Sequence, residues 1–188
     1  MKNLRTVLVL CLLTLGVVAA NAQINWGVKA GLNVSSLEGK NSDYADYKAG
    51  FNAGVFGQYM ITDAFGLESG LFYSMKGYKT DIVPLADGSS KTYNASYLQL
   101  PIQAIYKFEV GQNLYLYPAA GIYLAYGLGG TDKYFDSAKE FDLGLDVGVN
   151  LQFEKIIIGV GYERGFLKAF EIGKTYNSNV MVNVGYLF

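Results

Sequence analysis

Hydrophobic and polar residues alternate along almost the whole chain after residue 22. In the clearest stretch, Phe141–Glu154, every odd position is apolar and every even position is polar or glycine. A period of two residues is typical of a β-strand with two different faces, and a shift of one residue would exchange the faces. The pattern therefore predicts strands with a strongly specified register.

The same period divides the chain into eight strands. The predicted strands are Asn25–Ser35, Gly50–Ile61, Phe65–Gly77, Tyr93–Phe108, Leu114–Leu128, Phe141–Glu154, Ile156–Phe166 and Thr175–Phe188.

The segments between these strands alternate in length. The short ones are Thr62–Ala64, Glu109–Asn113 and Glu154–Lys155, and the longer, polar ones are Ser36–Ala49, Tyr78–Thr92, Gly129–Glu140 and Leu167–Lys174. Short periplasmic turns and long outer loops alternate in this way in outer-membrane barrels.

Aromatic residues gather at both ends of the apolar face of the strands. One end has Trp26, Tyr59, Phe65, Tyr106, Phe108, Phe153 and Tyr186, and the other has Phe51, Tyr73, Tyr126, Phe141, Tyr162, Phe166 and Tyr176. The twelve steps from Phe141 to Phe153 span about 40 Å along a strand, or about 30 Å of height when the strand is tilted. This height matches a lipid band with an aromatic girdle at each interface. The fold class that follows is all-β: an eight-stranded antiparallel up-and-down transmembrane β-barrel with its apolar face toward lipid.

One segment permits a different interpretation. Residues 110–131 contain no charge and are long enough for a transmembrane helix. They also contain Pro118 and several glycines, and their tyrosines follow no helical stripe, which favours a strand. Pro101 and Pro118 are unexpected in a barrel that has no edge strand, and we expect a local bulge near them.

The first 22 residues have the features of a cleaved secretory signal peptide. Lys2 and Arg5 precede an apolar stretch, and Ala20-Asn21-Ala22 supplies the small residues of a cleavage site. The expected organisation is a signal peptide at 1–22 and one barrel domain at 23–188.

Composition excludes several kinds of chemistry. The 15 basic residues do not outnumber the 16 acidic ones, which argues against a nucleic-acid partner. The chain contains no histidine, and its one cysteine, Cys11, lies in the signal peptide. Catalysis that uses a histidine base and metal sites built on histidine or thiolate are therefore excluded. We expect no catalytic residues, no cofactor and no metal site.

The polar phase of the strands should face the barrel interior. The predicted interior polar network is Lys29, Glu68, Lys76, Gln99, Gln103, Lys107, Asp142, Asp146, Asn150, Glu154 and Glu163, with Gln58 and Asn183 among them. Buried charges need partners, so we expect a charge-matched plug in which Glu68 and Lys107 form an ion pair. A narrow ion path through the same groups is the alternative. Asp142 and Asp146 stand about 13 Å apart on a strand, too far to share a metal ion or a proton.

A second group of residues should lie at the lipid interface. It comprises Trp26, Tyr106, Phe153, Arg164, Tyr186 and Phe188. Arg164 is either a ligand of lipid phosphate or a side chain that reaches to water.

Four stretches carry a resemblance to a known family: Trp26–Leu32 (WGVKAGL), Tyr97–Phe108 (YLQLPIQAIYKF), Phe141–Phe153 (FDLGLDVGVNLQF) and Val184–Phe188 (VGYLF). By these the chain resembles the PorT-like outer-membrane β-barrels, which are related in shape to the OmpA and OmpX barrels. The resemblance implies a cell-envelope location and a terminal aromatic strand that barrel-assembly machinery reads. One member serves a protein-secretion system, but no motif here transfers that role.

The expected protein is a non-enzymatic, multi-pass protein of a bacterial outer membrane. Its expected partners are outer-membrane lipid, the barrel-assembly machinery during insertion and an unidentified envelope protein. It would act as a structural, anchoring or interaction protein, for example as an accessory of an envelope or secretion machine. The alternatives are a narrow small-solute channel and a soluble exported barrel that binds an apolar ligand.

Overall fold

The computed structural model describes residues 24–39, 45–80, 91–130, 141–167 and 175–188, and within these it consists of β-strands and their connections. The predicted signal peptide at 1–22 lies outside the described residues. The strands are β1 (Ile24–Gly39), β2 (Ala45–Asp46), β3 (Lys48–Met60), β4 (Phe65–Thr80), β5 (Lys91–Tyr106), β6 (Phe108–Gly111), β7 (Leu114–Gly130), β8 (Phe141–Phe153), β9 (Ile156–Gly165) and β10 (Thr175–Leu187).

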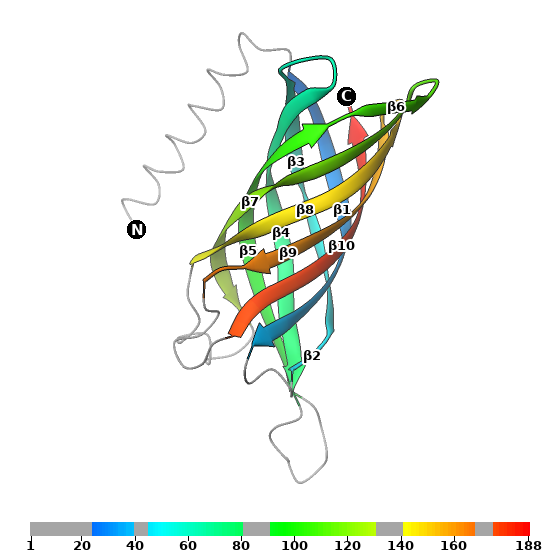
Figure 1. Ribbon diagram of the computed structural model, residues 1–188. Helices are drawn as coiled ribbons and strands as arrows, with labels where there is room; N and C mark the ends of the chain where they lie inside the picture. The colour runs from blue at the N-terminus through cyan, green and yellow to red at the C-terminus, as the bar shows by residue number, and fades with distance from the viewer. Residues whose placement is uncertain (1–23, 40–44, 81–90, 131–140, 168–174) are drawn as a thin grey trace.

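The strands form one closed antiparallel barrel (Figure 1). Apart from the short strands β2 and β6, each strand pairs with the next strand along the chain. β1 pairs with β10 from Gly27↔Leu187 to Gly39↔Thr175, so the sheet has no free long edge. The short β2 extends the sheet beside β4, and the short β6 continues β5 along β7. The barrel therefore has eight strands around its circumference. The predicted eight-stranded antiparallel barrel is confirmed.

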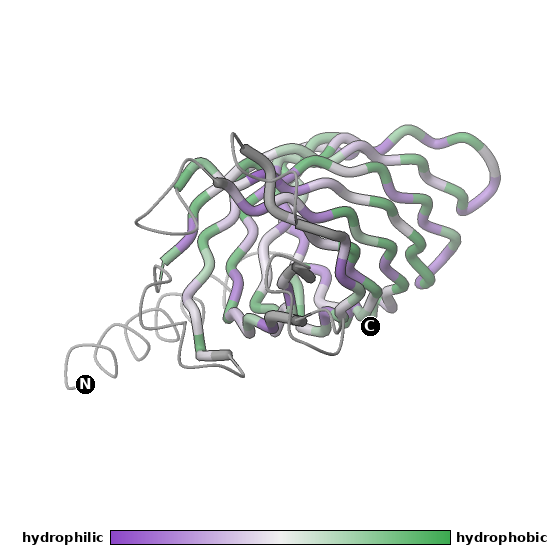
Figure 2. The backbone as a smooth tube through the Cα atoms, turned by 90° about the horizontal axis from the view of Figure 1, so that it is seen from below, coloured by the Kyte–Doolittle hydropathy of each residue, from purple (hydrophilic) through white to green (hydrophobic). Residues whose placement is uncertain are grey.

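Along the strands most polar residues are buried inside the barrel and most large apolar residues are exposed on its outer surface. In β8 the charged residues Asp142 and Asp146 are buried, whereas Phe141, Leu145 and Val149 are exposed. Figure 2 shows this alternation of hydrophilic and hydrophobic residues around the whole wall. A continuous apolar outer surface is stable in lipid but not in water, so the barrel is built to lie within a membrane. No helix in the described residues is long and apolar enough to cross a membrane.

The short connections lie at one end of the barrel, together with the start of β1 and the end of β10 (Figure 1). Glu154 and Lys155 form a two-residue connection between β8 and β9, in which Glu154 has φ 50°. Asn113, with φ 55°, closes the turn between β6 and β7. A positive φ matches tight hairpin turns to the twist of the flanking strands.

The interpretation of residues 110–131 as a helix is wrong, because β6 and β7 account for most of this segment. The expected bulge at the prolines is also wrong. Pairing is missing at Leu100 and Pro101 on the β4 side, and opposite Pro118 on the β5 side, but the register is the same before and after each gap. A proline removes one donor from the ladder, so each leaves a local gap. Register shifts lie elsewhere, between Ser96 and Tyr97 on β5 and between Glu109 and Gly111 on β6.

Candidate functional site: the barrel interior

The pleat places most of the predicted polar set inside the barrel. Lys29, Glu68, Lys76, Gln99, Gln103, Asp142, Asp146 and Glu163 are buried, and Lys107 and Asn150 are partly buried. Glu154 is different: it lies exposed in the turn between β8 and β9, so its inclusion in the interior network is wrong. Only its backbone oxygen takes part, as the acceptor of a hydrogen bond of 2.8 Å from Gln152.

One buried ion pair joins Lys29 on β1 to Glu68 on β4. The second oxygen of Glu68 accepts a hydrogen bond of 2.7 Å from the Gln58 amide, and the Lys29 ammonium also lies 4.3 Å from the ring centre of Phe56. Both charges are therefore compensated within the wall of β1, β3 and β4, as buried charges require.

The expected Glu68–Lys107 ion pair is wrong, because Lys29 is the partner of Glu68. The Lys107 ammonium instead donates hydrogen bonds of 2.8 Å to the amide oxygens of Gln58 and Gln152. Lys107 thus reaches Glu68 through Gln58. A neutral amide between two charges could not be distinguished from a direct pair by strand register alone.

A second buried ion pair joins Lys76 on β4 to Glu163 on β9, with 2.6 Å between nitrogen and oxygen. Because these strands are not neighbours in the sheet, the pair crosses the lumen. Gln99 and Asn179 also donate hydrogen bonds to the Glu163 carboxylate, and the Lys76 ammonium lies 4.4 Å from the ring centre of Tyr123. This arrangement ties opposite walls of the barrel together.

Asp142 and Asp146 have different surroundings although they share one face of β8. One oxygen of Asp142 accepts hydrogen bonds from Tyr123 (2.9 Å) and Asn177 (2.8 Å). Asp146 lines a cavity and has no hydrogen-bond or ion-pair partner within the described residues. The two carboxylates act separately, and no three Asp, Glu, His or Cys side chains of the described residues are grouped to hold a metal ion.

An apolar cluster fills the interior near the short-turn end. It consists of Phe56, Ile105, Tyr117, Ala119, Ile157 and Leu187, with Met60 and Phe72 packed against it. The alternation of polar and apolar residues does not distinguish these residues from the polar phase of their strands. The available signal was an apolar residue on the inward phase within a few residues of several short turns.

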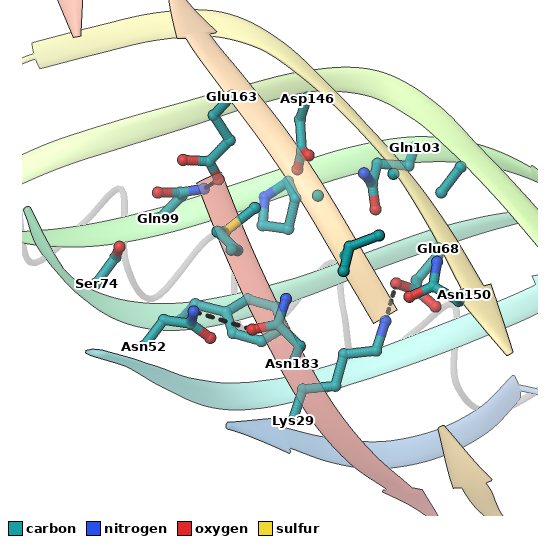
Figure 3. A pocket seen from close by; sticks show the side chains of 17 residues that line it. Lys29, Asn52, Glu68, Ser74, Gln99, Gln103, Asp146, Asn150, Glu163 and Asn183 are labelled. Atoms are coloured by element: carbon teal, nitrogen blue, oxygen red, sulfur yellow. Dashed lines mark hydrogen bonds and ion pairs between the residues drawn. The ribbon is translucent and has the colours of Figure 1, made fainter. Parts of the chain in front are cut away.

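A cavity of about 60 Å³ adjoins this cluster, because Phe72 and Ala119 belong to both, and Figure 3 shows the polar side chains around it. Its wall includes Lys29, Glu68 and Glu163 from the two ion pairs, together with Asp146 and the amides Gln99, Gln103, Asn150 and Asn183. A cavity of this size and polarity holds a few water molecules. The interior therefore has three levels: an apolar floor, a small polar chamber, and a hydrogen-bonded layer around Glu163 and Asp142.

The predicted lipid-interface residues lie on the outer surface. Trp26, Tyr106, Phe153, Arg164, Tyr186 and Phe188 are all exposed. The rings of Tyr106 and Phe108 are in contact at a tilt of 50°, and Tyr186 lies edge-on to Phe188, which places two aromatic pairs at the short-turn rim. Such rings suit a membrane interface, where one part of the side chain is apolar and the other wet.

Comparison with known proteins gives a family and a fold. Residues 19–171 match the family model described as outer membrane protein beta-barrel domain. No protein in the curated set matches. Among solved structures, OprG from Pseudomonas aeruginosa is similar with a TM-score of 0.54 and 13% identity over 89% of this chain and 97% of that chain.

Two further structures have the same architecture. Neisserial surface protein A has a TM-score of 0.52 and 18% identity over 87% of this chain and 97% of that chain. The outer membrane enzyme PagL has a TM-score of 0.53 and 14% identity over 83% of this chain and 99% of that chain. At these identities the likeness concerns the fold alone.

Proposed function

Because the chain belongs to the outer membrane protein beta-barrel domain family, we propose that it is a non-enzymatic integral protein of a bacterial outer membrane. In this role the barrel anchors the outer loops and the periplasmic rim, and these parts make the interactions. Loops carry specificity on rigid scaffolds, and an eight-stranded barrel is a rigid scaffold with little free space inside.

The filled interior is the observation that carries this proposal. The apolar cluster of Phe56, Ile105, Tyr117, Ala119, Ile157 and Leu187 occupies the lumen at the short-turn end. Above it, the Lys76–Glu163 pair crosses from β4 to β9. A solute moving along the barrel axis would have to displace both, which supports an anchor over a pore.

Conductance in a planar lipid bilayer tests the proposal. The purified protein should show no steady single-channel current in concentrated salt, because the apolar cluster and the Lys76–Glu163 pair both obstruct the lumen. A matched variant, Phe56→Gly with Ile105→Gly, should open the floor and give more frequent current steps than the parent. A steady ohmic current from the unmodified protein would favour the narrow small-solute channel instead.

The absence of histidine supports a non-enzymatic role. The likeness to PagL does not oppose it, because a shared fold does not carry an activity.

A narrower kinship to the PorT-like barrels is part of the proposal. It is supported by the four sequence stretches at 26–32, 97–108, 141–153 and 184–188. In this proposal the protein is an accessory of an envelope or secretion machine, although none of the four stretches is a motif for that role. Photo-crosslinking in intact cells from a site in the long loops, compared with a site at Gly111 in the short turn, would identify the partner and its side of the membrane.

Assembly and lipid contacts complete the proposed role. The terminal strand ends with Tyr186 and Phe188 exposed on the lipid side, which suits recognition by barrel-assembly machinery. Replacing Phe188 with Ala should lower the amount of barrel in the outer membrane, while Phe188→Tyr should preserve it. Arg164, also on the outer surface, fits contact with lipid phosphate.

A further inference from the structure

The central chamber contains a buried carboxylate that the rest of the interior leaves unpaired. Asp146 is only 5% exposed, and in Figure 3 its carboxylate points toward the middle of the chamber. No hydrogen-bond donor or cation of the described residues contacts it at bonding distance. An isolated buried carboxylate is costly, so a proton or a cation must compensate it.

The nearby lysines are already engaged. Lys29 pairs with Glu68, and Lys76 pairs with Glu163, so each ammonium has its own carboxylate. Lys107 donates to two amide oxygens near the short-turn end. The chamber wall includes the carboxylates of Glu68, Asp146 and Glu163. Because Lys29 and Lys76 pair with Glu68 and Glu163, Asp146 is the one carboxylate of this wall without an ammonium partner within the part of the chain that the structure describes.

Neutral oxygens surround the same space. Gln103 and Asn150 line the chamber, and their amides make no hydrogen bond within the described residues. Gln99 also lines the chamber, but its amide nitrogen is bound to Glu163 and its buried oxygen has no hydrogen-bond partner. Amide and carboxylate oxygens are ligands of hard cations.

We propose that the chamber binds one small monovalent cation, an alkali ion that keeps part of its water shell, with Asp146 as its charged ligand. A volume of about 60 Å³ admits an ion with about three or four waters. A divalent ion would require more charged ligands, and no cluster of three such side chains exists among the described residues. An anion would be repelled by Asp146. The inference does not depend on what the loops bind.

The test measures how the identity of the cation affects stability. The full-length protein, purified from outer membranes in a neutral detergent, would be heated in NaCl or in choline chloride at one constant ionic strength. Choline is too large for the chamber, so it controls for general screening. Ligand that binds only the folded barrel raises its unfolding temperature, and the rise should saturate with Na⁺ concentration.

Three variants show whether the stabilising cation binds in the chamber. Asp146→Asn should abolish the difference between NaCl and choline chloride. Glu154→Gln removes the same charge from an exposed turn and should keep the full difference. Gln103→Met removes one neutral oxygen and should raise the half-saturating Na⁺ concentration severalfold, which provides a readout if Asp146→Asn does not fold.

Each remaining outcome would overturn the proposal. Equal stability of the unmodified protein in NaCl and choline chloride would mean that a proton compensates Asp146 and that the chamber holds water only. A saturable Na⁺ effect that persists in Asp146→Asn, or that Gln103→Met leaves unchanged, would place the ion outside the chamber.

Discussion

Lys29 shows which features of the barrel interior follow from the position of a single residue and which do not. Its position on the inward phase of β1 follows from the alternation of polar and apolar residues, and this could be predicted from the sequence. Its partner could not, because Glu68 lies on β4, across β3, and two lysines were within reach of the carboxylate in the sequence pattern. Register fixes the depth of a side chain, whereas rotamers and amides such as Gln58 decide which charges meet.

A double-mutant cycle measures the Lys29–Glu68 pair. Lys29→Met leaves Glu68 buried without its cation and should cost about 3–5 kcal/mol of unfolding free energy. Lys29→Met with Glu68→Gln should cost less than the sum of the single changes, because neither charge is then left alone. Urea unfolding in lipid vesicles provides the free energies. The same cycle with Lys107→Met in place of Lys29→Met should show a smaller coupling, and a larger one would restore the original assignment.

A substitution at Val182 tests whether the outer face of the barrel lies in lipid. It is 50% exposed on β10 and pairs with Val160, which is 56% exposed, on β9. If both face the bilayer near its midplane, Val182→Arg should lower the unfolding free energy by about 2–4 kcal/mol. Val182→Leu is the control and should change it little. Equal stability of the arginine variant would place this face in water.

The strands themselves were predictable because each has two chemically different faces. The predicted and observed bounds of β8 and β9 differ by one residue at most, whereas β1, β4 and β5 extend two to four residues further toward the long loops than expected. The alternation of polar and apolar residues weakens near the long loops, so the sequence pattern does not show where these strands end. The interior apolar floor was missed for a related reason: Phe56 and Ile157 are isolated apolar residues on polar phases.

Hairpin topology gives a prediction about sidedness. The short connections all lie at one end, and the end of β4, the start of β5, the end of β7 and the start of β8 lie at the other. A peptide tag between Asp87 and Gly88, in a segment outside the described residues, should be labelled on intact cells. A tag between Gly111 and Gln112 should be labelled only after the outer membrane is permeabilised. The reverse pattern would invert the orientation.

At the scale of the whole molecule, closure of the sheet governs stability. Every long strand has two paired neighbours, and buried ion pairs cross or line the lumen. Such a barrel exposes no long strand edge with unpaired backbone groups. The eight-stranded architecture could be predicted from the sequence, because the number of strands follows from the number of turns. The chamber around Asp146 could not be predicted, because it exists only where opposite interior side chains are too short to make contact.

Closure predicts a heat-dependent mobility. Unboiled protein in a detergent gel should migrate as a compact species, and boiled protein should migrate differently, because heat is needed to open the closed sheet. The protein should also sediment with the outer membrane in fractionated cells. Recovery in the soluble periplasm without detergent would contradict the membrane assignment and favour the soluble ligand-binding barrel.

The first and last strands of the barrel, β1 and β10, meet at a seam in the closed sheet. Gly27 lies opposite Leu187, and the amide of Phe188 donates to the Trp26 oxygen, so the two ends of the barrel sequence are neighbours. The seam is thus equivalent to a hairpin without its turn, and a short linker could supply that turn while the chain is cut in a long loop. Such a circular permutant would retain every ladder of the barrel, yet it would begin and end elsewhere. It would separate two roles of the terminal strand: completing the wall, and presenting an end to the cell's assembly apparatus.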